Sequence, residues 1–302
     1  MWQGRATRRA VLAGMGASVL AHSRPGAQDV AADDIVGALD FHVTAKGESM
    51  LDLARHKDLG FLELMAADPD VDPWVPVPGT PVLLPTAHIL PAAPRRGMVV
   101  NLAELRLYAF LADGIVTHPI GVGRTGYTTP TGTTSIVRKQ EKPSWFPTET
   151  TRADDPTLPA VAPPPGPDNP LGDYALYLGR PSFLVHGTNK PWGVGCMVSR
   201  GCIRLYLEDI AALYPCIPVG TAVTVVAQAV KLGRKDGAMF IEAHPTRAQL
   251  LELARRDHFT PYPVPDVRAM VEDFAGADSH RLRWPVIATA LAERRGYPVR
   301  VD

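Results

Sequence analysis

Residues 183–205 read FLVHGTNKPWGVGCMVSRGCIRL, and this stretch decides what fold and chemistry we expect of the chain. The apolar residues before His186 have the pattern of a short buried strand that ends at a glycine turn. A glycine-rich segment then leads to Ser199, Gly201 and Cys202, and a helical pattern begins soon after. The stretch therefore predicts a strand that presents a histidine beside a loop that presents a cysteine.

A cysteine and a histidine in this setting indicate nucleophilic catalysis. A cysteine attacks a carbonyl as the thiolate, and its ordinary pKa of about 8.5 leaves only a few per cent ionised at pH 7. A nearby imidazole removes this obstacle, so we expect His186 to act as the base for Cys202. Gly201 is expected to let the backbone approach the substrate closely, and backbone N–H groups around residues 200–202 are expected to face the developing oxyanion.

The segments around this stretch read mostly as short strands with turn residues at close spacing. Asp113 followed by Gly114 is a common hairpin signal. Strand patterns occupy residues 98–111, 115–123, 133–139, 174–178, 182–186 and 221–226, and one helical pattern lies at 207–214. We therefore predict a mainly β catalytic domain over residues 97–228, a sandwich or a barrel-like core with a short helix.

Two smaller units flank this domain. Residues 40–90 read as strand, helix, helix and strand, which predicts a small α+β domain. A segment rich in proline and arginine at residues 91–97 looks like a stiff linker to the next domain. Residues 229–302 add a strand at 238–244 and helical patterns at 247–257 and 284–294, so we expect an α/β C-terminal extension.

The charge balance and the N-terminus limit the class of protein. The chain has 31 Lys and Arg against 31 Asp and Glu, so no basic field is available for nucleic acid. Arg5, Arg8 and Arg9 precede an apolar run of small residues, and the run TRRAVL resembles a twin-arginine signal. We expect residues 1–27 to be a Tat-like export signal; the alternative is an anchor helix of the mature protein.

The three cysteines fall between residues 196 and 216, an odd count that leaves at least one thiol without an intrachain partner. A disulfide between Cys196 and Cys216 would leave Cys202 free. Zinc is the rival interpretation, with His186 and the three cysteines as ligands, but the cysteines lack the short paired spacings of zinc sites. We expect no metal and no cofactor.

The block resembles the active-site motif of the L,D-transpeptidases, whose catalytic domain is the YkuD-type β-sandwich. The motif is a His-Gly pair followed by Ser/Thr-x-Gly-Cys, and the matching residues here are His186, Gly187, Ser199, Gly201, Cys202, Ile203 and Arg204. The sequence TPTG at residues 129–132 resembles another family element. Arg200 departs from the pattern, because many members carry a second histidine there. Residues 40–90 resemble a LysM module, a layout typical of Gram-negative periplasmic members.

The resemblance implies a ping-pong acyl transfer on peptidoglycan in the periplasm. Cys202 would attack the bond between diaminopimelate and the terminal D-Ala of a tetrapeptide stem, and His186 would move the proton. The acceptor would be the diaminopimelate of another stem or the C-terminal lysine of a lipoprotein. Arg204 would bind a stem carboxylate or brace the loop, with Ser199, Gly187 and Arg200 as further support. A LysM-like domain would contact the glycan, and carbapenems would acylate the thiol.

Two alternatives remain open at this point. The same site would make an L,D-carboxypeptidase or a lipoprotein-releasing hydrolase if water resolved the thioester. A non-catalytic wall-binding protein that uses only residues 40–90 belongs to another class, and the paired His186 and Cys202 argue against it.

Overall fold

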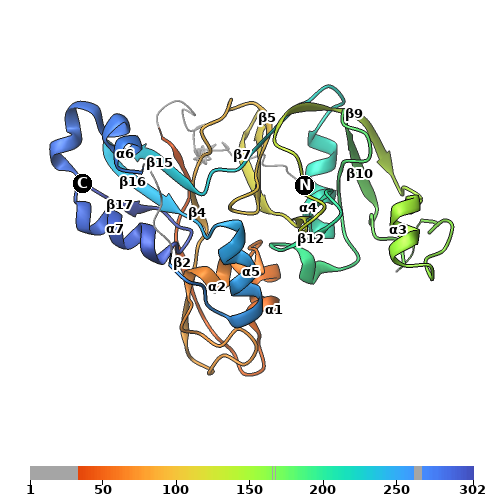
Figure 1. Ribbon diagram of the computed structural model, residues 1–302, viewed down its shortest axis with the longest axis horizontal. Helices are drawn as coiled ribbons and strands as arrows, with labels where there is room; N and C mark the ends of the chain where they lie inside the picture. The colour runs from red at the N-terminus through yellow and green to blue at the C-terminus, as the bar shows by residue number, and fades with distance from the viewer. Residues whose placement is uncertain (1–32, 165, 167, 262–266) are drawn as a thin grey trace, which may run out of the picture.

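The computed structural model describes residues 33–164, 166, 168–261 and 267–302 of the chain. The expected export signal at residues 1–27 lies outside the described residues. Within the described ranges, no helix combines the length and the apolar character needed to cross a bilayer. Figure 1 shows three lobes: a lower lobe of N-terminal residues, a central and right-hand lobe built on the large sheet, and a left-hand lobe of C-terminal residues.

An eight-stranded sheet forms the centre of the molecule, in the order β13-β11-β10-β9-β14-β5-β6-β7. Its strands are β5 (Gly97–Asn101), β6 (Arg106–Leu111), β7 (Gly114–Pro119), β9 (Gly132–Glu141), β10 (Tyr174–Leu178), β11 (Leu184–His186), β13 (Ile203–Arg204) and β14 (Ala222–Val226). The predicted mainly β class of the catalytic domain is confirmed.

The long strand β9 joins the two halves of this sheet. Its first residues, 132–135, pair with β14, and the following residues, 136–141, pair with β10. A sandwich would have two separate stacked sheets. Here the two halves are continuous through β9 and form one curled sheet. Both halves contribute to one core, which includes Met98 and Val223 on one side of β9 and Leu176 and Val185 on the other.

Two of the expected strands are interrupted. The pattern at residues 98–111 is divided by a turn between β5 and β6, where Leu105 has a φ of 58°. Leu102 and Leu105 lie in the turn itself, so apolar residues continue through it and the sequence reads as one strand. The single strand expected at residues 115–123 is likewise divided. Strand β7 ends at Pro119, and the last residues form the short β8 (Val122–Gly123), which pairs with β12 (Met197–Ser199) outside the large sheet.

The N-terminal unit has the expected strand–helix–helix–strand order. Its elements are β2 (Asp40–Val43), α1 (Met50–His56), α2 (Phe61–Ala67) and β3 (Pro81–Leu84), and β2 pairs with β3 in antiparallel fashion. The side chain of Ser49 accepts a hydrogen bond from the backbone N–H of Asp52, which caps α1. A further pair of short strands flanks the same unit: β1 (Ile35–Gly37) precedes it and β4 (Ala87–Ile89) follows it, and the two pair with each other.

This unit is packed against the catalytic sheet. Leu53 and Leu62 of its helices share one buried cluster with Leu105 and Leu107 of the β5–β6 region. Residues 91–97, which resemble a linker, therefore connect two units that have a common hydrophobic core. Burial of these side chains is worth roughly 1.5–3 kcal/mol each, so the two units stabilise each other.

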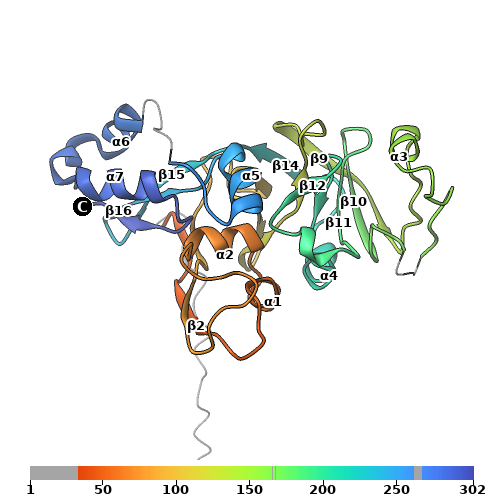
Figure 2. The same ribbon diagram turned by 60° about the horizontal axis from the view of Figure 1, so that its bottom comes forward.

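The C-terminal residues form a three-stranded sheet with helices on it. The elements are β15 (Val230–Lys235), β16 (Ala238–Ala243), β17 (Val299–Arg300), α5 (Arg247–Arg256), α6 (Val267–Ala275), η2 (Gly276–Arg281) and α7 (Trp284–Glu293). Met239, Ile241, Val271 and Ile287 make a separate buried cluster there. Helix α5 leaves this group and lies beside α2 of the N-terminal unit, as both Figure 1 and Figure 2 show.

Candidate active site

His186 is the last residue of β11, a strand that lies between β10 and β13 in the large sheet. Its side chain is buried, with the residue 3% exposed. The Nδ1–H group donates a hydrogen bond of 2.5 Å to the carbonyl oxygen of Gly187. This bond assigns the ring proton to Nδ1 and leaves Nε2 as the nitrogen that can accept a proton.

The environment keeps the imidazole neutral. Burial lowers the pKa of His186 to about 3, and the nearby positive charge of Arg204 acts in the same direction. The carbonyl groups of Gly187 and Leu171 oppose this shift only in part. At neutral pH, His186 is therefore an unprotonated ring in a fixed tautomer, as a general base requires.

Cys202 lies immediately before β13, which runs parallel to β11. Its thiol is partly exposed, lines the same cleft as His186, and lies 3.5 Å from the carbonyl oxygen of Ser182, to which it donates. Burial raises the pKa of the Cys202 thiol, although the backbone N–H of Leu184 and the charge of Arg204 lower it. The resting pair is accordingly a neutral thiol and a neutral imidazole.

Ser199 holds the turn that carries Cys202. Its buried hydroxyl donates a 2.6 Å hydrogen bond to the carbonyl oxygen of Cys202 and accepts one of 3.0 Å from the N–H of Gly201. The Gly201 amide, expected to face an oxyanion, is therefore engaged within the turn. Ser199 is a structural brace at this position.

Gly201 and Gly187 are required by close packing. Gly201 has a φ of 106°, and a Cβ there would lie 2.6 Å from the ring of Phe183. We expected Gly201 to allow a substrate close to the backbone. In the structure, the group that lies close to Gly201 is the ring of Phe183. A Cβ on Gly187 would lie 2.9 Å from Leu207, the first residue of α4 (Leu207–Cys216).

Thr129 is a site residue whose role was not predicted from the sequence. Its buried hydroxyl donates a 2.8 Å hydrogen bond to the carbonyl oxygen of Gly201. The same hydroxyl accepts a 3.1 Å hydrogen bond from the N–H of Gly123 in β8. Thr129 therefore fixes the turn before Cys202 to the neighbouring strand. Its position in the TPTG segment, residues 129–132, is the feature of the sequence that pointed to this residue.

The two arginines of the motif have different surroundings. Arg204 lines the cleft, burial lowers its pKa, and its Nε is a buried donor that meets no hydrogen-bond partner in the part of the chain that is described. Arg200 instead forms an ion pair with Asp154, the last residue of α3 (Glu149–Asp154). The guanidinium of Arg200 also lies 4.7 Å from the ring centre of Tyr127. Both arginines line the cleft, but Arg200 is paired with Asp154 of α3, whereas Arg204 forms no ion pair among the described residues.

The cleft around these residues has a volume of about 1170 Å³, which is large enough for a branched peptide. One side is formed by the segment that includes Trp145, Phe146 and α3, and the other by η1 (Pro191–Gly193) and β12. His186 and Cys202 lie in its lining together with Arg204.

The other two cysteines are separate from this cleft, and both are free thiols, so the disulfide considered between them is not present. Cys196 precedes β12, where burial raises its thiol pKa to about 12. Cys216 is exposed at the end of α4, whose Ile210 and Leu213 pack into the core. Neither of the two metal-like groups among the described residues includes a cysteine.

Comparison with known proteins places this site in a family. A profile described as the L,D-transpeptidase catalytic domain (YkuD) matches residues 95–225. "Probable L,D-transpeptidase ErfK/SrfK" of Escherichia coli K12 is 39% identical over 252 residues, which cover 80% of this chain and 79% of the relative. "Probable L,D-transpeptidase YcfS" of the same strain is 35% identical over 279 residues, covering 88% and 85%.

A third relative, "Probable L,D-transpeptidase YbiS" of the same strain, is 37% identical over 257 residues and covers 82% of each chain. All three similarities extend well beyond the catalytic domain. The chain therefore belongs to the L,D-transpeptidase family and is a cysteine-dependent acyltransferase that acts on peptidoglycan.

Proposed function

We propose that Cys202 is the nucleophile and His186 the general base of an L,D-transpeptidase that cuts and rejoins peptidoglycan stem peptides. The observation that carries this proposal is the neutral imidazole of His186, whose Nδ1 is bonded to the Gly187 carbonyl, in the same cleft as the Cys202 thiol. The catalytic domain of the family, over residues 95–225, contains both residues.

The proposed first half-reaction forms a thioester. Nε2 of His186 takes the thiol proton as the sulfur of Cys202 attacks the carbonyl carbon of the scissile peptide bond. The tetrahedral intermediate collapses with cleavage of the C–N bond, and the imidazolium gives its proton to the departing amine. D-Ala leaves and the acyl group stays on sulfur.

The second half-reaction transfers the acyl group to an amine. His186 removes a proton from the incoming amine, whose nitrogen attacks the thioester carbonyl, and the thiol of Cys202 is restored with that proton. We assign the donor as a tetrapeptide stem cut between diaminopimelate and D-Ala. The acceptor is the side chain of a second diaminopimelate or the C-terminal lysine of a lipoprotein.

Arg204 is the proposed anchor for a carboxylate of the stem. Its guanidinium lines the cleft, and its Nε is buried without a partner among the residues described. A buried donor of this kind gains most from a charged acceptor, and guanidinium groups bind carboxylates in a bidentate manner. The position next to Ile203 and two residues after Cys202 puts this anchor close to the scissile bond.

We further propose that the N-terminal unit is a LysM-like domain that contacts glycan, and that the enzyme works in the periplasm. The strand–helix–helix–strand order of β2, α1, α2 and β3 supports the first part. The aromatic side chains of Phe41 and Trp74 in this unit are exposed, as side chains that stack on sugar rings must be. The basic and apolar sequence at residues 1–27 supports the second part.

The test is incubation with tetrapeptide-containing muropeptides, followed by mass analysis. The wild type is expected to release D-Ala and to form a peptide dimer, with a thioester on Cys202 detectable by intact mass. Cys202→Ser should do neither. Arg204→Lys keeps the charge but loses the bidentate geometry, and should raise KM for the donor more than it lowers kcat. Release of D-Ala with tripeptide alone would identify a hydrolase, and no reaction with any stem peptide would refute the assignment.

A further inference from the structure

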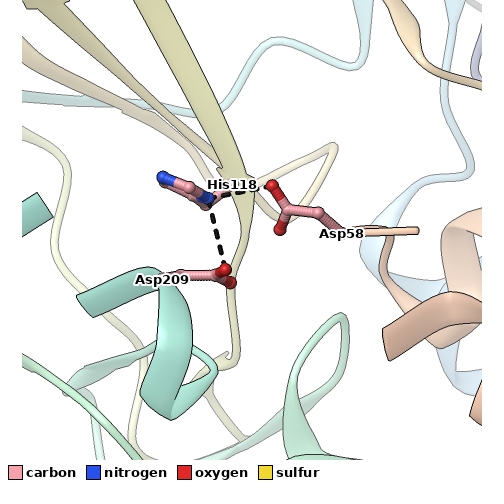
Figure 3. Close-up of side chains that lie close together, drawn as sticks. All are labelled: Asp58, His118 and Asp209. Atoms are coloured by element: carbon pink, nitrogen blue, oxygen red, sulfur yellow. Dashed lines mark hydrogen bonds and ion pairs between the residues drawn. The ribbon is translucent and has the colours of Figure 1, made fainter. Parts of the chain in front are cut away.

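Three potential metal ligands meet at the contact between the N-terminal unit and the catalytic sheet. Asp58 lies between α1 and α2, His118 is on β7, and Asp209 is in the first turn of α4. Figure 3 shows both carboxylates directed at the same ring nitrogen of His118. One donor atom of each residue lies within 4.8 Å of the other two. We propose that these three side chains bind one Zn²⁺ ion.

The distances suit a single ion. Nδ1 of His118 lies 2.9 Å from an oxygen of Asp58 and 3.6 Å from an oxygen of Asp209. Donors on one tetrahedral Zn²⁺ lie roughly 3.3 Å apart, because the metal–ligand bonds are roughly 2.0–2.1 Å long. Relative to that spacing, the distance from Nδ1 to the Asp58 oxygen has to lengthen and the distance to the Asp209 oxygen has to shorten, each by roughly 0.3–0.4 Å. Asp58 can make this adjustment, since its side chain is 40% exposed.

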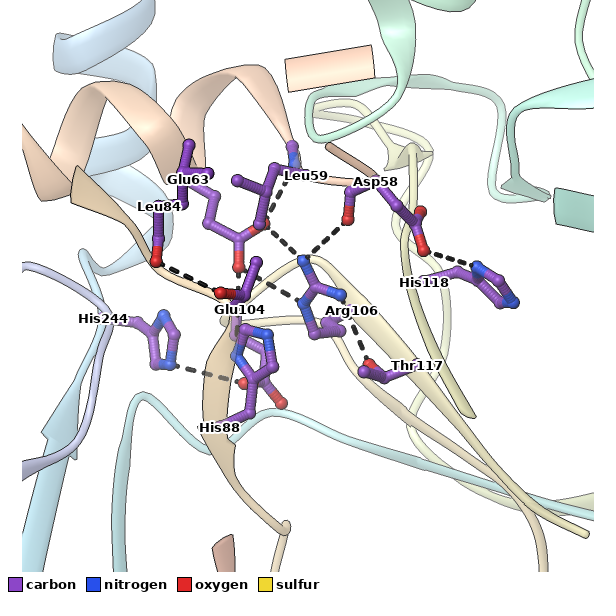
Figure 4. Close-up of polar contacts among 12 residues, drawn as sticks. Asp58, Leu59, Glu63, Leu84, His88, Glu104, Arg106, Thr117, His118 and His244 are labelled. Carbon is purple, nitrogen blue, oxygen red and sulfur yellow. Dashed lines mark hydrogen bonds and ion pairs between the residues drawn. The ribbon is translucent and has the colours of Figure 1, made fainter. Parts of the chain in front are cut away.

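Two buried carboxylate oxygens of the cluster, Oδ2 of Asp209 and Oδ1 of Asp58, receive no hydrogen bond from a donor group in the described part of the chain. The two carboxyl groups face each other within hydrogen-bonding reach, and Asp209 as a whole is only 7% exposed. The guanidinium of Arg106 donates to the backbone carbonyl of Asp58 and is held by Glu63, as Figure 4 shows. Buried carboxylates are normally paired with a cation or coordinate a metal.

A second cluster of potential ligands differs from this one because it already contains a lysine. His88, Glu104 and Glu242 also bring three potential ligands together, and all three are fully buried. There, however, the ammonium group of Lys231 forms ion pairs with both glutamates, at 2.8 Å for Glu242. That cluster already contains its cation. The cluster of Asp58, His118 and Asp209 has no lysine or arginine side chain paired with either carboxylate within the ranges described.

The ligand types select the metal. One imidazole and two carboxylates are a common donor set for Zn²⁺, whereas Mg²⁺ and Ca²⁺ prefer oxygen ligands alone. Two carboxylates also neutralise the two charges of the ion. The partial exposure of Asp58 leaves room for a water as fourth ligand and gives the ion a path of entry.

A bound ion would join two units of the protein. Asp58 belongs to the N-terminal unit, whereas His118 and Asp209 belong to the catalytic domain. Further contacts cross the same surface, among them the ion pair of Arg55 with Glu208 at 2.9 Å and the hydrogen bond from the Tyr206 hydroxyl to the Leu59 carbonyl at 3.1 Å. Zn²⁺ would strengthen this contact and stabilise the folded protein by mass action.

The test measures zinc binding to the untagged full chain after removal of metal by a chelator. All proteins carry Cys202→Ala and Cys216→Ser, so that the thiol of the cleft and the fully exposed thiol cannot bind the ion. Binding of ZnCl₂ is followed by calorimetry, and the thermal unfolding midpoint is measured with and without the ion. One equivalent should bind and raise the midpoint. Mutation of groups that merely support a ligand costs roughly 10–100-fold in affinity, so Asp209→Asn should weaken binding at least tenfold.

Two further variants and one spectrum complete the design. Asp58 has a φ of 53°, which asparagine tolerates, so Asp58→Asn should weaken binding without disturbing the loop. Glu208→Gln, on the neighbouring residue of α4, should leave zinc binding unchanged. X-ray absorption at the zinc edge should show one imidazole, oxygen neighbours and no sulfur. Binding of no zinc by the wild-type site, sulfur in the spectrum, or equal affinity in folded Asp209→Asn would overturn the proposal. The first two outcomes do not depend on the folding of any variant.

Discussion

The hydroxyl of Thr129 donates a 2.8 Å hydrogen bond to the carbonyl oxygen of Gly201, the residue directly before Cys202. Because the same hydroxyl accepts from Gly123 N–H, one side chain connects the cysteine turn to β8. The turn is thus held from outside by Thr129 and from inside by Ser199. The position of the thiol depends on both hydroxyl groups.

Thr129→Val should misplace the turn while keeping the shape of the side chain. The change leaves two buried backbone groups without a partner, at a cost of about 1–3 kcal/mol each. We expect kcat for stem cleavage to fall on the order of tenfold. Thr129→Ser retains the hydroxyl and serves as the control, with activity near that of the wild type. Equal kcat in both variants would show that the hydrogen bonds do not position Cys202.

Substitution of Cys202 and substitution of Cys196 should have opposite effects on activity. Cys202→Ala and Cys202→Ser should abolish turnover and the acyl adduct, because the thiolate is the nucleophile. Cys196→Ala should retain the chemistry, since Cys196 lies outside the cleft and burial raises its thiol pKa to about 12. Intact-mass analysis after exposure to a carbapenem measures the adduct in each protein. An adduct of normal yield in Cys202→Ala would contradict the assignment.

Much of the catalytic domain was predictable because its strands alternate in the ordinary way. The strand expected at residues 174–178 is β10, and the helix expected from residue 207 is α4. The motif also predicted that His186 and Cys202 would line one cleft, since a strand and a nearby glycine-rich loop lead to them. These features are encoded within a few residues of each other.

The remainder depends on contacts between distant segments. Ser199 and Gly201 were visible in the motif, but nothing local shows that the Gly201 amide is bonded to the Ser199 hydroxyl. The common core of Leu53 and Leu107 could not be read from residues 91–97, whose proline and arginine content resembles a linker. The cluster of Asp58, His118 and Asp209 likewise joins three segments that are far apart in the sequence.

The contact between the units provides a stability prediction. Nη2 of Arg106 lies 2.7 Å from Oε2 of Glu63, and both side chains are almost fully buried (Figure 4). Glu63→Gln leaves the guanidinium without its charge partner, which costs about 3–5 kcal/mol for a buried pair. The midpoint of thermal unfolding should therefore fall on the order of 10 °C.

Two controls belong to that measurement. Glu208→Gln removes an exposed ion pair with Arg55 across the same contact, and should cost less than about 1 kcal/mol. The double variant Glu63→Gln with Arg106→Met removes the stranded charge and should recover much of the loss. If Glu63→Gln were no less stable than Glu208→Gln, the buried pair would not hold the two units together.

The burial of His186 determines how the rate of acylation should depend on pH. Since burial lowers the pKa of His186 to about 3, below its ordinary value of 6.5, the ring stays neutral as the pH falls through 6.5 and is protonated only near pH 3. The wild-type rate of acylation by a carbapenem should therefore be nearly flat between about pH 5 and 8.

In His186→Ala, only the thiolate that forms by loss of the thiol proton to solvent can react. Because burial also raises the Cys202 pKa, the rate of this variant should rise about tenfold per pH unit over the same range. At neutral pH it should be lower by about two to four orders of magnitude, and His186→Gln should do no better because an amide does not exchange the proton. A wild-type acid limb centred near pH 6.5 would contradict the neutral ring, and a His186→Ala rate equal to the wild type would mean that another group activates Cys202.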